Sequence, residues 1–166
     1  MILSSSAFRI NEEIPAKYTC EGENVSPPLR IESIPAPTLS LVIVMDDPDT
    51  ALDSLIHWLM YDVVPIERIR EGLVPGTAGI NDFSRPGYIG PCPPLGESHR
   101  YVFRVFALDI TTGLAPHQKW TTVEPMLVGH VLDRAEAVCR YRRTRQSIQV
   151  PDYEGGASDS FLHWMK

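Results

Sequence analysis

The sequence predicts a mainly β protein with helices at its periphery, and three observations support this fold class. Fifteen prolines punctuate the chain, and they interrupt the first hundred residues so often that long helices are excluded there. Short runs of β-branched and aromatic residues follow one another between these prolines. Near residue 124 the apolar spacing changes to that of a helix. We therefore expect several strands first and one amphipathic helix near the end.

Three apolar segments are predicted to be strands. Residues 39–45 form a β-branched run bounded by prolines and acids, which indicates a strand buried on both faces. Residues 57–64 have the same character and end at Pro65. Residues 100–109 are the clearest strand, because both of its faces are apolar apart from Arg104. We expect this third strand to be central in its sheet.

Residues 123–143 are predicted to form the amphipathic helix. Apolar residues recur there at spacings of three and four. Thr121 or Thr122 can cap its start, and Pro125 fits its first turn. Arginines near its end would complement the helix dipole. This is the one helix whose position the sequence predicts.

The charge balance and the apolar runs exclude some classes of protein. The net charge of −6 opposes general nucleic-acid binding, whose affinity depends on Lys and Arg neutralising phosphates. No apolar run approaches the roughly 18 to 20 residues that span a bilayer. The first residues lack the basic and long apolar regions of a secretory signal, so we expect a cytoplasmic location.

The three cysteines do not form a recognisable site. Cys20, Cys92 and Cys139 have neither a CxxC pair nor a spacing that suggests zinc. Reduced thiols are the default expectation. A disulfide between Cys20 and Cys92 stays open as an alternative, because both lie in segments predicted to be loops.

Several common catalytic motifs are missing from the sequence, including GxGxxG after a strand, GxxxxGK[ST], GxSxG and HExxH. Nucleotide binding, α/β-hydrolase chemistry and zinc-protease chemistry therefore have no support. Three loop-rich segments remain that are dense in residues suited to a site. They are residues 20–29, residues 46–58 and residues 87–101.

These three segments carry a resemblance to a known family. The motifs DDPD, HW, GYIGPCPPLGESHRY and EPMLVGHVLDRAEAV, in this order, closely resemble the phosphatidylethanolamine-binding protein family, also called the Raf kinase inhibitor protein family. The segment CEGENVSPPL is most similar to its bacterial and archaeal branch. The resemblance implies an antiparallel β-sandwich with Greek-key connections and peripheral helices. One domain is expected over residues 1–143, followed by a C-terminal extension over residues 144–166.

The extension matches nothing in the family. It could pack on the domain or be exchanged with a partner subunit. Phe161 and Trp164 are apolar, and their exposure would favour a homodimer.

The resemblance also implies a small anion pocket. It places four polar side chains around this pocket and two further residues in its wall. The four are Asp47, His57, His99 and Tyr101, and the wall residues are Gly90 and Pro93. Two imidazoles can become charged beside a phosphate and donate strong hydrogen bonds to it. A bare carboxylate would repel phosphate, so the aspartate is expected to orient a histidine or to accept a proton from the ligand.

The leading functional hypothesis is non-enzymatic binding of a phosphate-bearing ligand such as a phospholipid head group, with no cofactor and no catalytic residue. Eukaryotic relatives bind kinases or carboxypeptidases, so a regulatory role with a protein partner is implied but not identified. One alternative is a hydrolase that uses Asp47 and His57 with Cys92 as nucleophile. Another is a metal site built from Asp47, His57 and His99. Thr50 and Ala51 replace the family's Ala-Pro, which leaves the shape of that loop open.

Overall fold

The computed structural model describes residues 1–51 and 53–144, and its secondary structure is mainly β. The strands are β1 (Ile2–Ser4), β2 (Leu29–Glu32), β3 (Ser40–Asp47), β4 (Leu55–Val63), β5 (Arg68–Ile69), β6 (Thr77–Ala78), β7 (Ser98–Leu108) and β8 (Val131–Arg142). The helical segments are the 3-10 helices η1 (Ala16–Tyr18) and η2 (Glu124–Leu127) and the short helix α1 (Trp120–Val123). The predicted fold class is confirmed. In the part of the chain described here, no helix has the length and apolar character needed to span a bilayer.

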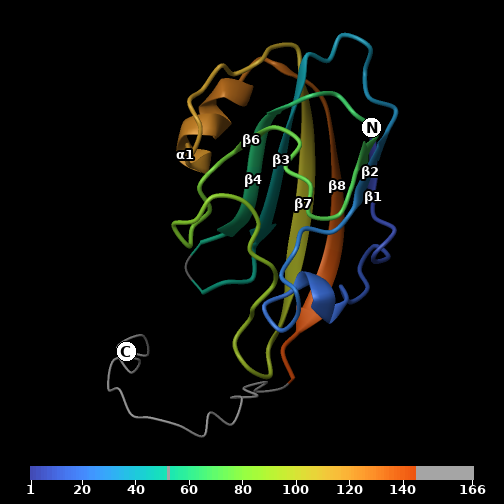
Figure 1. Cartoon of the computed structure of the whole chain (residues 1–166), viewed down its shortest axis with the longest axis vertical. Helices are drawn as coiled ribbons and strands as arrows, with labels where there is room; N and C mark the ends of the chain where they lie inside the picture. Colours follow the sequence, from blue (N-terminus) through green and yellow to red (C-terminus); the bar gives the residue numbers. More distant parts are fainter. Residues whose placement is uncertain (52, 145–166) are drawn as a thin grey trace, which may run out of the picture.

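The strands form two antiparallel sheets. The smaller sheet has the order β1-β2-β5, and the larger has the order β6-β4-β3-β7-β8. β3 pairs with β7 although three elements of the chain separate them, which is consistent with a Greek-key connection. In Figure 1, β1 and β2 lie on one side of the larger sheet and α1 lies on the other.

The larger sheet is covered on both faces, and the middle parts of its central strands are apolar apart from Arg104. Every residue of β3 is buried. Ile43 and Met45 face the main core, which includes Leu3 and Ile31 from the smaller sheet. Val42 and neighbouring residues on the opposite face pack with the segment that contains α1 and η2. Alternation along a strand sends successive side chains to opposite faces, so one strand serves two cores.

Two of the three predicted strands lie within one or two residues of β3 and β4, and the third is β7. β7 pairs with β3 on one side and with β8 on the other, which confirms that it is central. Its residues Tyr101, Phe103 and Val105 share one face and enter the main core.

The predicted helix over residues 123–143 is wrong. The helical part ends with η2 at Leu127, and residues 131–142 form β8, which pairs with β7 from Ser98 to Leu108. Helix-forming residues dominate this segment, but cross-strand pairing outweighs their local preference. A pattern of period two was present, since Ala135, Ala137, Cys139 and Tyr141 all face the main core, but the first three are small and mark it only weakly. The arginines expected at a helix end therefore lie along an edge strand.

Candidate functional site

A pocket of about 390 Å³ opens at one end of the larger sheet. β3 ends there, while β4 and β7 begin there, because neighbouring strands run antiparallel. Asp47 is the last residue of β3, and His57 and His99 lie near the starts of β4 and β7. All three line the pocket with Pro93 from the loop before β7. The topology thus brings together four of the residues that the sequence implied for the site.

His99 is buried between two carboxylates. Its Nδ1 lies 2.7 Å from Oδ2 of Asp47, and its Nε2 lies 3.2 Å from Oε2 of Glu97. Only the doubly protonated imidazolium can donate to both acceptors. Burial opposes this charge, but the hydrogen bonds to Asp47 and Glu97 outweigh it and raise the pKa of His99. Asp47 is 2% exposed, so its carboxylate orients the His99 ring rather than extending toward solvent.

His57 is held in the opposite protonation state. Its Nδ1 donates to the carbonyl oxygen of Ile89 at 2.9 Å, since a carbonyl can only accept. The ring lies edge-on to Phe83 and Tyr101, with centroids 4.9 Å and 5.3 Å away. Burial lowers the pKa of His57, although the Ile89 carbonyl and the charge of Asp47 oppose it. In the neutral ring the remaining nitrogen, Nε2, is a hydrogen-bond acceptor.

Tyr101 and Gly90 lie behind the pocket lining rather than in it. Tyr101 is fully buried, and among the described residues its hydroxyl has no hydrogen-bond partner. Burial, together with the nearby charge of Asp47, raises the pKa of Tyr101, so the phenol stays protonated. Gly90 packs against the N-terminal segment, where an added Cβ would lie 2.1 Å from the carbonyl oxygen of Tyr18. Only glycine allows this close approach of the two backbones.

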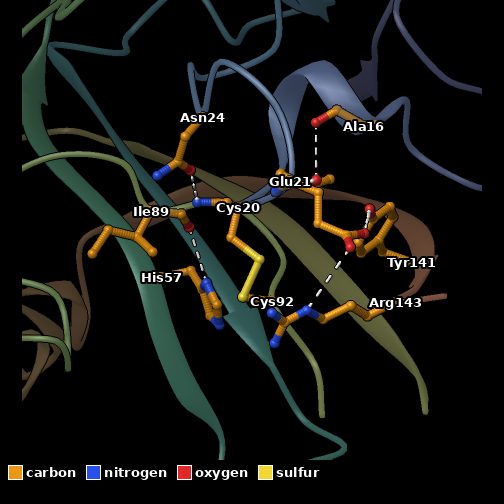
Figure 2. Close-up of a disulfide and its surroundings, with 11 residues drawn as sticks. Ala16, Cys20, Glu21, Asn24, His57, Ile89, Cys92, Tyr141 and Arg143 are labelled. Atoms are coloured by element: carbon orange, nitrogen blue, oxygen red, sulfur yellow. Dashed lines mark hydrogen bonds and ion pairs between the residues drawn. A yellow bond between two sulfur atoms is a disulfide. The ribbon is translucent and has the colours of Figure 1, made fainter. Parts of the chain in front are cut away.

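A disulfide between Cys20 and Cys92 ties the pocket wall to the N-terminal segment (Figure 2). The default expectation of reduced thiols is therefore wrong for these two cysteines. Cys92 and its neighbour Pro93 both line the pocket, and the N–H of Cys20 donates to the carbonyl of Pro91 at 3.1 Å. The third cysteine, Cys139, is free and buried, and burial raises its pKa to about 12.

A polar cluster lies on the side of the disulfide away from His57, as Figure 2 shows. The hydroxyl of Tyr141 donates to the carboxylate of Glu21, and Nε of Arg143 lies 3.9 Å from the same carboxylate. Tyr141 belongs to β8, and Glu21 follows Cys20 directly. The disulfide, the cluster and the larger sheet therefore form one connected support for the pocket wall.

The loop after β3 closes back on the strands that frame the pocket. The N–H of Asp49 donates to Oδ1 of Asp47 at 2.9 Å. Arg100 of β7 donates to Asp49 from its backbone N–H and from its guanidinium group. The hydrogen bond with Arg100 lowers the pKa of Asp49 to about 2, against a smaller effect of burial. Thr50 and Ala51, where the sequence departs from the family pattern, line the pocket.

Sequence reasoning missed several residues of the pocket, and two of them, Glu97 and Phe83, contact its histidines. Glu97 lies two positions before His99, and residues so spaced along extended chain share a face, so this signal was available. Phe83 comes from the loop between β6 and β7, and nothing in its local pattern indicated that it would reach His57.

The arrangement removes groups on which the two chemical alternatives depend. Within residues 1–51 and 53–144, no three His, Cys, Asp or Glu side chains gather as a metal ion would require. Two of the side chains proposed as metal ligands already have other partners. Asp47 accepts a hydrogen bond from His99, and Nδ1 of His57 donates to the carbonyl oxygen of Ile89. Cys92 is bonded to Cys20 and so lacks the thiolate that a nucleophile needs. What the pocket offers a ligand is a donor on His99 and an acceptor on His57.

Comparisons with known proteins identify relatives along most of the chain. The profile of the family described as phosphatidylethanolamine-binding protein matches residues 4–142. A UPF0098 protein of Pyrococcus abyssi is 44% identical over 153 residues, which cover 86% of each chain. A UPF0098 protein of Aquifex aeolicus is 42% identical over 154 residues, covering 86% of this chain and 89% of that protein.

Two solved structures share the fold. One is a Chlamydia trachomatis protein described as a phosphatidylethanolamine-binding protein homologue, with a TM-score of 0.82 and 33% identity, covering 86% of this chain and 97% of the other. The second is YbcL of E. coli, described as a new member of the mammalian family of this name. Its TM-score is 0.77 and its identity 25%, over 84% of this chain and 96% of that protein.

Proposed function

Because the chain belongs to the phosphatidylethanolamine-binding protein family, we propose that it is a binding protein whose ligand carries a phosphate group or a similar anion. The ligand class includes free phosphate and a phospholipid head group, which share the same tetrahedral anion. Asp47, His57, His99 and Pro93 form the ligand site in this proposal, and Tyr101 and Gly90 support it from behind.

The observation that carries the proposal is the pair of unlike histidines in one pocket. His99 is charged and presents an N–H at Nε2, whereas His57 is neutral and presents a lone pair at Nε2. A monoprotonated phosphate has oxygens that accept and one hydroxyl that donates, so it can satisfy both rings at once. A carboxylate can accept from His99 but has no proton to give to His57.

The same groups argue against catalysis as the main role. A hydrolase would need a nucleophile or an activated water beside a general base. Cys92 is in a disulfide, and Asp47 is committed to orienting His99. The hydrolase alternative therefore lacks the nucleophile that it was given, Cys92.

A regulatory role through a protein partner, such as a kinase or a protease, remains a proposal that rests on the family alone. The cytoplasmic location is also a proposal. The disulfide weighs against an ordinary reducing cytoplasm, because cystines persist mainly in oxidising compartments or in intracellular proteins of hyperthermophiles.

The proposal is tested by calorimetric titration with inorganic phosphate at pH 6.5. His99→Asn keeps an amide N–H for Asp47 but removes the charged donor at Nε2. Loss of one charge-assisted hydrogen bond predicts a decrease in phosphate affinity of about ten- to a hundredfold. His130→Ala is the matched control, since His130 also pairs with a carboxylate, Asp109, at 2.8 Å but lies outside the pocket. Equal phosphate affinity in His99→Asn and the unmodified protein would reject this pocket as the phosphate site.

A further inference from the structure

We infer that Glu97 is an internal competitor for the ligand anion, and that it lowers the affinity of every anion that must displace it. In the free protein its carboxylate occupies the donor of His99 that a ligand would use, so an anion binds by displacing it. The inference rests on the proposed function, because it concerns the same donor.

The geometry leaves the ligand a single ring donor on His99. Nδ1 is held by Asp47 at 2.7 Å, and the aspartate side chain is 3% exposed. Nε2 is the other donor, and Oε2 of Glu97 lies 3.2 Å from it. A phosphate oxygen that accepted from Nε2 would need the place of that carboxylate oxygen. Glu97 and the ligand therefore exclude one another at this atom.

Glu97 is built so that its side chain can leave while its backbone stays. Its side chain is 59% exposed, in contrast to the buried Asp47 on the other side of the ring. The N–H of Glu97 donates to the carbonyl of Pro94 at 3.0 Å, and the carbonyl of Glu97 accepts from the N–H of Arg143 at 3.3 Å. Gly96 before it has a φ of 86°, which forms the turn that positions this residue. Rotation about the side-chain bonds is enough to free the His99 donor.

Only an anion with contacts beyond His99 overcomes this competition. Asp49 is paired with Arg100, so the charges left near His99 are those of Asp47 and Glu97. A ligand with a single carboxylate displaces Glu97 from His99 poorly, because Glu97 presents the same group at a high effective concentration. Phosphate differs by its additional oxygens and by the proton that it can donate to His57. Phosphate therefore binds against this competition, whereas a simple carboxylic acid binds only weakly.

The test is a calorimetric titration of Glu97→Gln with inorganic phosphate at pH 6.0. This pH lies below the ordinary pKa of an imidazole, and the hydrogen bond to Asp47 remains in the variant to favour the charged form of His99. The variant removes the ion pair between Glu97 and His99 and the repulsion between Glu97 and the anion. We therefore predict that phosphate affinity rises about three- to tenfold. Titration with acetate should show a gain of similar size from a much weaker starting affinity. Glu67→Gln is the control, because it removes the same charge from an exposed position beside β5 in the smaller sheet.

The outcomes separate the inference from the function on which it rests. Phosphate affinity that is unchanged or lower in Glu97→Gln, while His99→Asn still loses affinity, overturns the inference and leaves the proposed function standing. Phosphate binding by neither the unmodified protein nor Glu97→Gln overturns both. An equal gain in Glu97→Gln and Glu67→Gln would also overturn the inference, because it would assign the effect to net charge.

Discussion

His57 and His99 lie in the same pocket, yet their ring nitrogens are used differently. His99 has an acceptor at each nitrogen, and these are the carboxylates of Asp47 and Glu97. His57 donates to one carbonyl oxygen and is otherwise surrounded by aromatic rings and apolar wall. The pKa of His99 is raised and that of His57 is lowered. Even without a ligand, the site therefore favours the charged form of His99 and the neutral form of His57.

We expect NMR titration of the ring protons to give a midpoint above pH 6.5 for His99 and below pH 6.5 for His57. The two shifts act on stability in opposite directions. The contribution of His99 is fully present below pH 6.5 and is lost as pH rises through its raised pKa. The contribution of His57 is present above pH 6.5 and is lost as pH falls through its lowered pKa. Identical midpoints for the two rings would contradict this assignment.

The residues of the site were predictable where a motif carried them. Asp47, His57, Pro93 and His99 were implied by the family resemblance, and the antiparallel strands bring them together. Whether they bind the ligand is still a prediction. Glu97 was not proposed, although its spacing from His99 placed it on the same face of extended chain. The states of the two imidazoles could not be predicted, because they depend on Ile89 and on burial that only the fold creates.

At the scale of the elements, the loop before β7 depends on cross-links to the N-terminal segment. The disulfide joins Cys20 to Cys92, which are 72 residues apart. Close to it, the N–H of Gly90 donates to Asn24 at 2.7 Å, and the hydroxyl of Tyr88 donates to the carbonyl of Tyr18 at 2.7 Å. This loop carries Cys92 and Pro93 into the pocket. Loss of the cross-links would therefore also loosen the pocket wall.

Reduction of the disulfide should destabilise the protein. A loop of this length predicts a loss of about 4 kcal/mol in the free energy of unfolding, by the entropy of the unfolded chain. Cys20 and Cys92 are both exposed, so a reductant can reach them. Thermal unfolding with and without dithiothreitol measures the loss, and a variant with both residues changed to Ser is the control that dithiothreitol should not affect. A thiol assay under denaturing, non-reducing conditions that finds three free thiols would contradict the disulfide, which predicts Cys139 alone.

The elements also show where sequence patterns fail. β3, β4 and β7 were predicted because their β-branched and aromatic runs are typical of buried strands. β8 was mistaken for a helix because most of its core-facing residues are small and its outward residues favour helices. Residues 131–142 form a strand because the edge of β7 is available for pairing along its whole length. The disulfide was expected only as an alternative for a similar reason, because only the packed fold brings Cys20 and Cys92 together.

At the scale of the molecule, the two sheets and the α1 segment make a rigid frame that leaves one end of β3, β4 and β7 available for a site. The larger sheet has apolar cores on both faces, and its strand ends project beyond them. The prediction of one domain over residues 1–143 is untested. The predicted extension, with Phe161 and Trp164, lies beyond residue 144 and so outside the described residues. The function proposed for the whole chain therefore depends on the pocket alone.

The central claim is that His57 and His99 hold one anion between them, and NMR of imidazole nitrogens during a phosphate titration tests it most directly. Nitrogen signals report protonation and hydrogen bonding at each ring separately. We predict that the Nε2 signals of His57 and His99 shift together along one binding curve, while those of His117 and His130 outside the pocket stay unchanged. Unchanged signals for both pocket histidines at saturating phosphate, or equal shifts in all four rings, would contradict the account.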